Sequence, residues 1–399
     1  MSRSDQRRVR RLHWWNRGSG IRLRVWMVVN VLLLSTISYG VYAAVQSKAQ
    51  GAPFAGLGVA PSAPGLLSGL GSGGKKKPAA TVPDKSLFLD PKGVYFGAAT
   101  PGAPYSSGEV SEVAAAAGGV RPTMTEFFVN WTQDFRPAMI TSAYDHGTLP
   151  VISWEPWAGG QENNLGGGQT PADQTNQPKY RLANIIDGSF DSYITAFAQG
   201  VAAAKWPVAL RFAHEMNGTW YPWSEKANGN KAGQYVAAWR HVHDLFQKAG
   251  ATNVIWVWSP NIVRPVPHTK LSTLYPGDAY VDWVGLTGYG VREASPADTF
   301  DPTLRQVRTL TKKPMLITET GAQPDKDKVS WVRSFFPWLE QNHDIVGFVW
   351  TEKTKTTGAL ADWRFDGDAQ SQDAFQTGIS TAPLVTGLGV TEPSSGSTP

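Results

Sequence analysis

Two glutamates are the residues in this sequence best placed to do chemistry together. Glu215 closely follows the apolar run Pro207–Ala213, Glu319 follows the apolar run Pro314–Thr318, and a glycine comes within three residues of each glutamate. Such a run is typical of a buried strand that ends in a turn. In a barrel of parallel strands, both carboxyl groups would lie at the edge that carries the active site. Two facing carboxyl groups are the minimum equipment for cleaving a glycosidic bond.

A repeating pattern between residues 86 and 385 supplies the elements that would position these glutamates. Eight apolar runs alternate with segments of helical period, such as Phe190–Lys205, Gly233–Ala249 and Val329–Gln341. The runs are Gly93–Thr100, Pro122–Trp131, Leu149–Pro156, Pro207–Ala213, Asn253–Ser259, Val281–Thr287, Pro314–Thr318 and Ile345–Trp350. Eight strand–helix units predict an α/β fold of the (β/α)8 TIM barrel type. An open, doubly wound sheet is the alternative, but no glycine-rich phosphate motif follows the first run.

Aromatic residues gather at the predicted carboxyl ends of these strands. They are Trp154, Trp157, Trp220, Tyr221, Trp223, Trp258, Tyr289 and Trp350, and Glu155 ends the third run among them. Core packing explains some of these rings, because tryptophan fills large cores. A sugar-binding cleft also explains why so many lie beside carboxylates. We therefore predict that Trp154, Glu155 and Trp258 contribute to substrate binding.

Arg211 lies on the same strand face as Glu215, two pleats below it. An arginine buried there needs an acidic partner. We expect an inward-facing ion pair that supports the substrate-binding site. The alternative is an arginine whose aliphatic stem simply packs in the barrel wall.

Metal and serine chemistry are less well supported. His214 precedes Glu215, but a zinc-binding helix needs a second histidine four residues later, and Gly218 occupies that position. His241 and His243 fall within a helical pattern without an evident third ligand. The chain has no cysteine and no Gly-x-Ser-x-Gly elbow. We expect neither a metal nor another cofactor.

The same residues together resemble glycoside hydrolase family 26, from about Gly93 to Phe375. The most specific segment is Arg211–Trp223, which reads RFAHEMNGTWYPW. Supporting segments are Asp187–Gly188 with Asp191 and Tyr193, Trp256–Asn261, Asp282–Gly285 with Tyr289, Ile317–Glu319, and Asp362–Arg364. The resemblance implies a retaining endo-β-glycosidase on a barrel whose catalytic glutamates end strands four and seven. It implies that Glu215 is the general acid/base and Glu319 the nucleophile.

The resemblance also implies roles for four neighbours of the two glutamates. His214 would orient the site beside the acid/base, and Tyr289 would hydrogen-bond the nucleophile. Trp220 and Trp350 would form platforms for sugar rings. All four are therefore predicted substrate-binding residues.

The expected substrate follows from one difference between this sequence and the mannanases of the family, at the end of strand three. The family includes β-mannanases, mixed-linkage β-glucanases and β-1,3-xylanases, and its mannanases carry a substrate-binding histidine near the end of strand three. This chain has Ser153–Trp157, which reads SWEPW, at that place. We therefore expect a mixed-linkage or related β-glucan as the polysaccharide substrate. The alternatives are a β-mannanase, a transglycosylase, or a carbohydrate-binding or polysaccharide-assembly protein on the same barrel, although intact Glu215 and Glu319 speak against the last.

The N-terminal part of the chain has a different composition. Residues 1–48 carry nine Lys or Arg and one Asp, a balance of +8, so the remainder stands at −3 within the net charge of +5. A mildly acidic body argues against a nucleic-acid partner. The uncharged stretch Val25–Val45 follows eight arginines and is close to the roughly 20 residues that span a bilayer.

These features predict the order of the regions. Residues 1–24 form a basic cytoplasmic segment, 25–45 a transmembrane anchor, 46–85 a flexible linker rich in Gly, Pro, Ala and Ser, and 386–399 a disordered tail. A cleaved signal peptide is the alternative to the anchor, because the small pair Ala43–Ala44 follows the apolar core. In either case the barrel, at 86–385, is extracytoplasmic, and we expect it to be a monomer.

Overall fold

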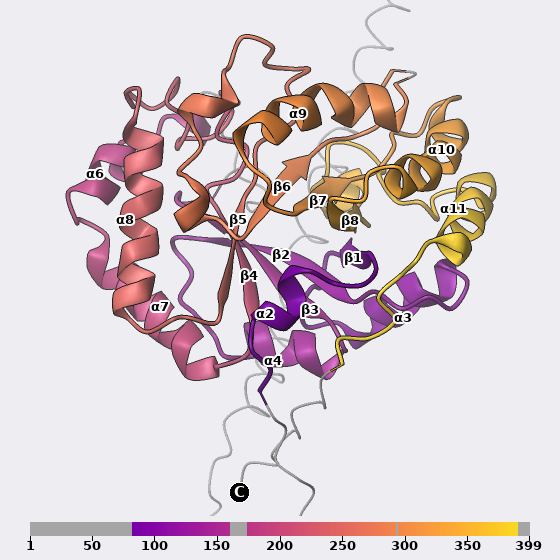
Figure 1. Cartoon of the computed structure of the whole chain (residues 1–399), viewed down its shortest axis with the longest axis horizontal. Helices are drawn as coiled ribbons and strands as arrows, with labels where there is room; N and C mark the ends of the chain where they lie inside the picture. The colour runs from indigo at the N-terminus through magenta and orange to yellow at the C-terminus, as the bar shows by residue number, and fades with distance from the viewer. Residues whose placement is uncertain (1–81, 160–173, 293, 390–399) are drawn as a thin grey trace, which may run out of the picture. The chain divides into compact units, whose positions relative to one another are not determined.

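Eight parallel strands close into a barrel in the computed structural model, which describes residues 82–159, 174–292 and 294–389 (Figure 1). Each strand pairs with its neighbours in sequence, and β8 closes the ring by pairing with β1. The strands are β1 (Tyr95–Ala99), β2 (Met124–Asn130), β3 (Leu149–Glu155), β4 (Val208–Phe212), β5 (Val254–Trp258), β6 (Trp283–Thr287), β7 (Met315–Thr320) and β8 (Ile345–Thr351). The predicted (β/α)8 barrel and all eight predicted strands are confirmed.

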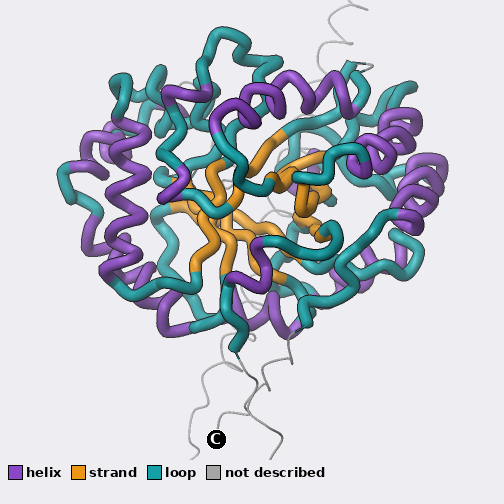
Figure 2. The backbone as a smooth tube through the Cα atoms, viewed as in Figure 1, coloured by secondary structure: helices purple, strands orange, loops and turns teal. Residues whose placement is uncertain are grey.

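Helices surround this barrel (Figure 2). The α-helices are α2 (Ser86–Leu89), α3 (Ser107–Ala116), α4 (Ala138–Asp145), α6 (Leu182–Ile186), α7 (Asp191–Ala204), α8 (Gln234–Lys248), α9 (Pro296–Leu310), α10 (Lys328–Glu340) and α11 (Ala369–Thr381). Short 3₁₀ turns are η1 (Pro178–Tyr180), η2 (Leu271–Thr273), η3 (Asp278–Tyr280) and η4 (Lys355–Thr357). Because helices cover the outer face and side chains fill the inside, the strands read as continuous apolar runs.

Strand β7 is irregular where it carries Glu319. Its pairing with β6 shifts register between Leu286 and Thr287, so that Thr287 pairs with Glu319. Its pairing with β8 shifts again between Ile317 and Thr320. Such irregularities re-aim a side chain and are common beside active sites. The carboxyl end of β7 is therefore shaped around Glu319.

The two ends of the described barrel meet its body. Lys85, at the end of the predicted linker, donates to the Asp282 carboxylate at 2.9 Å. At the other end, the Val385 amide donates to the Val94 carbonyl at 3.0 Å. None of the helices in the described ranges is both long and apolar enough to span a bilayer. The predicted membrane segment Val25–Val45 lies outside those ranges, as do most of the linker and residues 390–399.

Candidate active site

A cavity of about 820 Å³ lies at the carboxyl ends of the strands. Each of the eight strands, or the segment that follows it, supplies at least one lining residue: Ala99, Phe128, Glu155, Glu215, Asn261, Tyr289, Glu319 and Thr351. The two glutamates that stood out in the sequence therefore share one cavity. This is the edge at which TIM barrels carry their active sites.

Glu215 reaches the cavity through an unusual backbone turn after β4. Ala213 and Glu215 have φ angles of 45° and 53°, in the left-handed region that few residues other than glycine adopt. The amide of Glu215 donates to the Ser259 carbonyl at 2.7 Å, which holds the turn against the segment after β5. Backbone strain of this kind persists only where the surroundings hold it, and it is common at active sites.

Trp220 and Gly218 fix the carboxyl group of Glu215. The indole Nε1 of Trp220 donates to Glu215 Oε2 at 2.5 Å. The ring lies so close to Gly218 that a Cβ there would come within 2.4 Å of it. Glycine at this position therefore allows the indole to reach the carboxyl group. The side chain of Asn261 lies in the same cavity and acts to lower the pKa of this carboxyl group.

The surroundings of Glu215 favour its protonated form. Burial, and next the negative charge of Glu319, raise the pKa of Glu215 to about 7, although Arg211, Asn261 and Trp220 act in the opposite direction. Burial acts in this way because it removes water from the charged form. A carboxyl group with this pKa still carries its proton at mildly acidic pH, as a general acid must.

Glu319 has a different environment within the same cavity. Arg211 Nη1 donates to its Oε1 at 2.5 Å, and the Tyr289 hydroxyl donates to its Oε2 at 2.9 Å. The Tyr289 hydroxyl is itself 3.0 Å from Thr351 Oγ1. One cation and one hydroxyl thus hold the two oxygens of Glu319 in a fixed orientation.

Arg211 forms the buried ion pair that its position suggested, and it has two acidic partners. Its guanidinium is fully buried; Nη1 contacts Glu126 Oε1 at 3.1 Å as well as Glu319. It also donates to Ser259 and Thr287. Burial raises the pKa of Glu126 to about 7, against the effect of Arg211. Arg211 does not line the cavity, so it supports the substrate-binding site from a position beneath Glu319 and does not itself face the substrate.

Replacing Arg211 with methionine should strongly destabilise the barrel. The variant leaves the buried Glu126 and the cavity-lining Glu319 without their cation, and breaking a buried pair such as Arg211–Glu126 typically costs about 3–5 kcal/mol. Without Arg211, which lowers it, the pKa of the buried Glu126 rises further in the folded state, so the folded state binds more protons than the unfolded state over a wider pH range. Because stability falls with rising pH in that range, the deficit should be larger at pH 8 than at pH 5.

Urea unfolding of Arg211→Met and of Arg308→Met at both pH values would test this. Arg308 pairs with Asp344 at 2.6 Å, but both side chains are more than a third exposed, so its loss should cost at most about 1 kcal/mol. Equal unfolding free energies for the two variants would contradict a supporting role for the buried pair.

His214 lies behind the cavity wall. Its side chain is buried; Nε2 is 3.3 Å from the Tyr221 hydroxyl and 4.0 Å from Glu155 Oε1. Burial lowers the pKa of His214, so the ring is neutral. Tyr221 and Glu155 line the cavity while His214 does not. The predicted direct contact of His214 with substrate is therefore corrected; the ring supports two residues that do face the cavity.

Three predicted sugar-contacting tryptophans point away from the cavity. Trp154, Trp258 and Trp350 are each fully buried. Trp154 packs against rings of α7 and α8, and the Trp258 indole donates to the Leu274 carbonyl. The Trp350 indole donates to the Trp363 carbonyl, and its ring packs against α10 and α11. Their predicted roles as substrate contacts are wrong, because they fill the layer between the barrel and its helices.

Other aromatic residues face the cavity instead. Alongside Trp220 and Tyr289, the lining aromatic residues are Phe127, Phe128, Trp157, Tyr221 and Trp363. The Trp363 ring lies 4.3 Å from that of Tyr289, beside the residue that holds Glu319. Trp157 and Tyr221 are in edge contact at 5.4 Å. Phe128 and Trp363 were missed from the sequence, although alternation along β2 from the inward Glu126 indicates that Phe128 also points inward.

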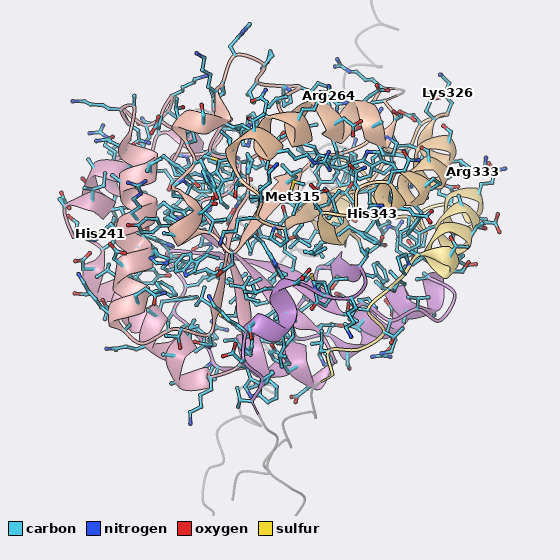
Figure 3. The ribbon with its side chains drawn as sticks, in the orientation of Figure 1. His241, Arg264, Met315, Lys326, Arg333 and His343 are labelled. Carbon is cyan, nitrogen blue, oxygen red and sulfur yellow. The ribbon has the colours of Figure 1, made fainter. Side chains whose placement is uncertain are left out.

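The histidine pair that suggested a metal lies on the outer helices. His241 is on α8 at the periphery of the barrel, with Nε2 2.6 Å from Asp191 (Figure 3). The His243 ring packs against Trp256 and Tyr280. Within the described ranges, no three His, Asp or Glu side chains are grouped closely enough to hold a metal ion.

The sequence is similar to several known proteins. The model of glycosyl hydrolase family 26 matches residues 164–360. Endoglucanase H of Acetivibrio thermocellus is 31% identical over 268 residues, which is 63% of this chain and 27% of that protein. Beta-1,3-xylanase TXYA of a Vibrio species is 26% identical over 194 residues, 42% of this chain and 40% of that protein. The chain therefore spans less than half of the length of either relative.

Solved structures show the same fold. A GH26 β-mannanase of Bacteroides ovatus superposes with a TM-score of 0.56 at 20% identity, covering 76% of this chain and 92% of that one. A (β/α)8 barrel whose mouth holds two carboxyl groups in contrasting environments has the architecture of a glycoside hydrolase. The chain belongs to glycoside hydrolase family 26.

Proposed function

We propose that this protein is a retaining endo-β-glycosidase that cleaves a polysaccharide, with Glu215 as general acid/base and Glu319 as nucleophile. The observation that carries the proposal is the contrast between two carboxyl groups in one cavity. Burial raises the pKa of Glu215 to about 7, whereas Glu319 is held by a guanidinium and a tyrosine hydroxyl. One group thus suits proton donation and the other nucleophilic attack.

The reaction then proceeds in two steps. Glu319 attacks the anomeric carbon and forms a covalent glycosyl ester, while Glu215 donates its proton to the departing oxygen. The ionised Glu215 next takes a proton from water, whose oxygen attacks the same carbon and releases Glu319. If a sugar hydroxyl replaces water, the product is longer than the substrate, so product sizes distinguish hydrolysis from transglycosylation.

The cavity wall at the end of β3 supports a β-glucan as substrate. The hydroxyl of Ser153 is turned inward and donates to Glu126 at 2.6 Å, and Glu155 and Trp157 face the cavity. Among the described residues that line this part of the wall, none is a histidine. The 31% identical relative is named an endoglucanase. The structural neighbours named mannanases are at most 20% identical to this chain and support only the fold.

We expect kcat/KM on mixed-linkage β-glucan to exceed that on unsubstituted β-mannan by at least about tenfold. Mannose carries an axial 2-hydroxyl, and a site without a partner for it loses about 1–3 kcal/mol of binding to the transition state. Initial rates on both polymers measure the preference, with Glu319→Ala as the blank for contaminating activity. A preference for mannan would contradict this assignment and show that another residue binds the axial hydroxyl.

We further propose that the barrel lies outside the cytoplasm, attached to the membrane by Val25–Val45. Eight arginines precede this uncharged stretch, and basic residues stay on the cytoplasmic side. Membrane fractions should contain the protein with its N-terminal peptides intact, as measured by mass spectrometry. A mature protein that begins near residue 45 would instead identify a cleaved signal peptide.

A further inference from the structure

Lys353 is a cavity residue that the proposed mechanism does not use. Among the described lining residues the other ionisable acids and bases are Glu155, Glu215, Tyr221, Tyr289 and Glu319, so Lys353 supplies the cation. Its orientation follows from the chain beyond β8. Thr351 and Lys353 line the cavity, whereas Glu352 between them turns away and accepts from the Phe365 amide at 3.1 Å. Alternation along an extended chain thus directs Lys353 inward.

The ammonium group of Lys353 is held in place. Nζ lies 4.6 Å from the ring centroid of Phe128, which also lines the cavity. The Lys353 carbonyl accepts a hydrogen bond from the Trp363 amide at 3.1 Å, which fixes the backbone. The side chain is half-buried. A cation–π contact stabilises an ammonium by roughly 0.5–2 kcal/mol, but it satisfies none of its three N–H donors.

No carboxylate in the described ranges pairs directly with this ammonium group, although its charge acts to lower the pKa of the buried Glu126. In those ranges, no carboxylate oxygen lies within 4.0 Å of Lys353 Nζ. Glu126 and Glu319, from β2 and β7, are both held by Arg211. Burial raises the pKa of Glu126 and of Glu215 to about 7, so both carry protons at mildly acidic pH.

The remaining acid of the cavity wall belongs to another part of the barrel. Glu155 ends β3, which β1 and β2 separate from β8 in the ring. Its Oε2 accepts from the Trp157 indole at 3.2 Å, and its Oε1 is 4.0 Å from His214. Among the described residues, the β8 side of the cavity therefore carries a cation without an ion-pair partner, and Glu155 lies on the β3 side.

We propose that Lys353 forms a binding site for a carboxylate carried by the glycan, on a sugar at or next to the cleavage point. The acidic sugar is placed near the cleavage point because Lys353 is only two residues after Thr351. The Thr351 hydroxyl contacts the Tyr289 hydroxyl, and the Tyr289 hydroxyl donates to Glu319. A half-buried ammonium gains more from a charged acceptor than from a neutral hydroxyl. The substrate class becomes an acidic β-glycan, and this inference rests on the proposed glycosidase function.

Matched polymers test the inference. Three forms of one β-glucan serve as substrates. The first is the neutral polymer, the second is oxidised at C6 to carboxylates, and the third is carboxymethylated to the same charge density as the second. Lys353→Met should lose at least about tenfold more kcat/KM on an acidic polymer than on the neutral one, and Lys353→Arg should retain the preference. Added salt should weaken the preference of the wild-type protein for the acidic polymer over the neutral one, because salt screens the attraction between the charges. Lys326→Met, which removes an exposed lysine at the edge of the barrel (Figure 3), should show no such difference.

Comparison of the two acidic polymers identifies the source of the carboxylate. A Lys353-dependent preference for the C6-oxidised polymer indicates a uronic acid residue, and one for the carboxymethylated polymer indicates an acidic substituent. Equal losses of Lys353→Met on the neutral and both acidic polymers would overturn the inference, because Lys353 would then contact hydroxyls or only pack on Phe128.

Calorimetry in the Glu319→Gln background separates this inference from the proposed function. An oligosaccharide of the C6-oxidised glucan and its neutral counterpart are titrated into Glu319→Gln and into Glu319→Gln/Lys353→Met. Tighter binding of the acidic oligosaccharide that depends on Lys353 supports the inference even if the wild-type protein hydrolyses neither polymer. Equal affinities for the two oligosaccharides would overturn it even if the wild-type protein is an active glycosidase.

Discussion

Glu319→Ala should lower kcat on polysaccharide by on the order of 10⁴-fold or more, as the loss of a nucleophile does in other covalent mechanisms. The carboxylate is held by Arg211 and Tyr289, so the wild-type nucleophile is already oriented before substrate arrives. Alanine leaves those donors without a nucleophile between them. No glycosyl ester can form, and substrate binding alone does not break the bond.

Azide distinguishes a lost nucleophile from a damaged fold. In the space left by the Glu319 carboxylate, azide can attack the anomeric carbon, so rate should return in proportion to azide concentration. The product should be a glycosyl azide of inverted anomeric configuration. Glu340→Ala, an exposed glutamate at the end of α10, is the matched control and should keep wild-type activity without azide. Wild-type turnover by Glu319→Ala would remove Glu319 from the mechanism.

The strands could be predicted from the sequence because the relevant signal is local. A strand buried on both faces must be an apolar run, and a run of that length bounded by turn residues has few alternatives. The carboxyl end of each run then locates Glu215 and Glu319. What local sequence does not specify is which side chains of a run point inward.

The misplaced tryptophans show how that direction is set. Trp154 and Trp350 each lie one residue before an inward residue, Glu155 and Thr351, so both must point outward. Trp258 likewise precedes Ser259, whose hydroxyl accepts from Arg211 inside the barrel. Once one inward residue of a strand is recognised, alternation decides its neighbours, and that rule corrects all three assignments.

The network below the cavity depends on closure of the ring and has no local signal. Arg211 on β4 joins Glu126 on β2 to Glu319 on β7, and these residues are far apart in sequence. Trp363 reaches the cavity from the segment after β8. An inward arginine predicts that some acid lies near it, but only the barrel determines that two acids share it. The same geometry makes Arg211 both a support for the fold and a support for Glu319.

Glu215→Ala should affect substrates according to their leaving groups. For polysaccharide, whose departing oxygen is strongly basic, kcat/KM should fall by about 10²–10⁴-fold, the usual contribution of a general acid. For a 2,4-dinitrophenyl glycoside, whose leaving group needs no proton, formation of the glycosyl ester should keep most of its rate. Pre-steady-state release of dinitrophenol measures that step by itself, and equal losses on both substrates would make Glu215 a structural residue.

The pH profile tests the same assignment independently. Because the protonated form of Glu215 is active and its pKa is raised to about 7, wild-type kcat/KM on polysaccharide should fall about tenfold per pH unit above that value. Burial also raises the pKa of Glu126 to about 7. The pH at which kcat/KM begins to fall, the alkaline limb of the profile, therefore does not by itself identify the carboxyl group that titrates. In Glu215→Ala the limb should disappear, whereas in Glu126→Gln it should remain. A limb that survives Glu215→Ala and vanishes in Glu126→Gln would transfer the titration to the buried carboxyl group beneath Arg211 and leave the general acid to be sought elsewhere in the cavity.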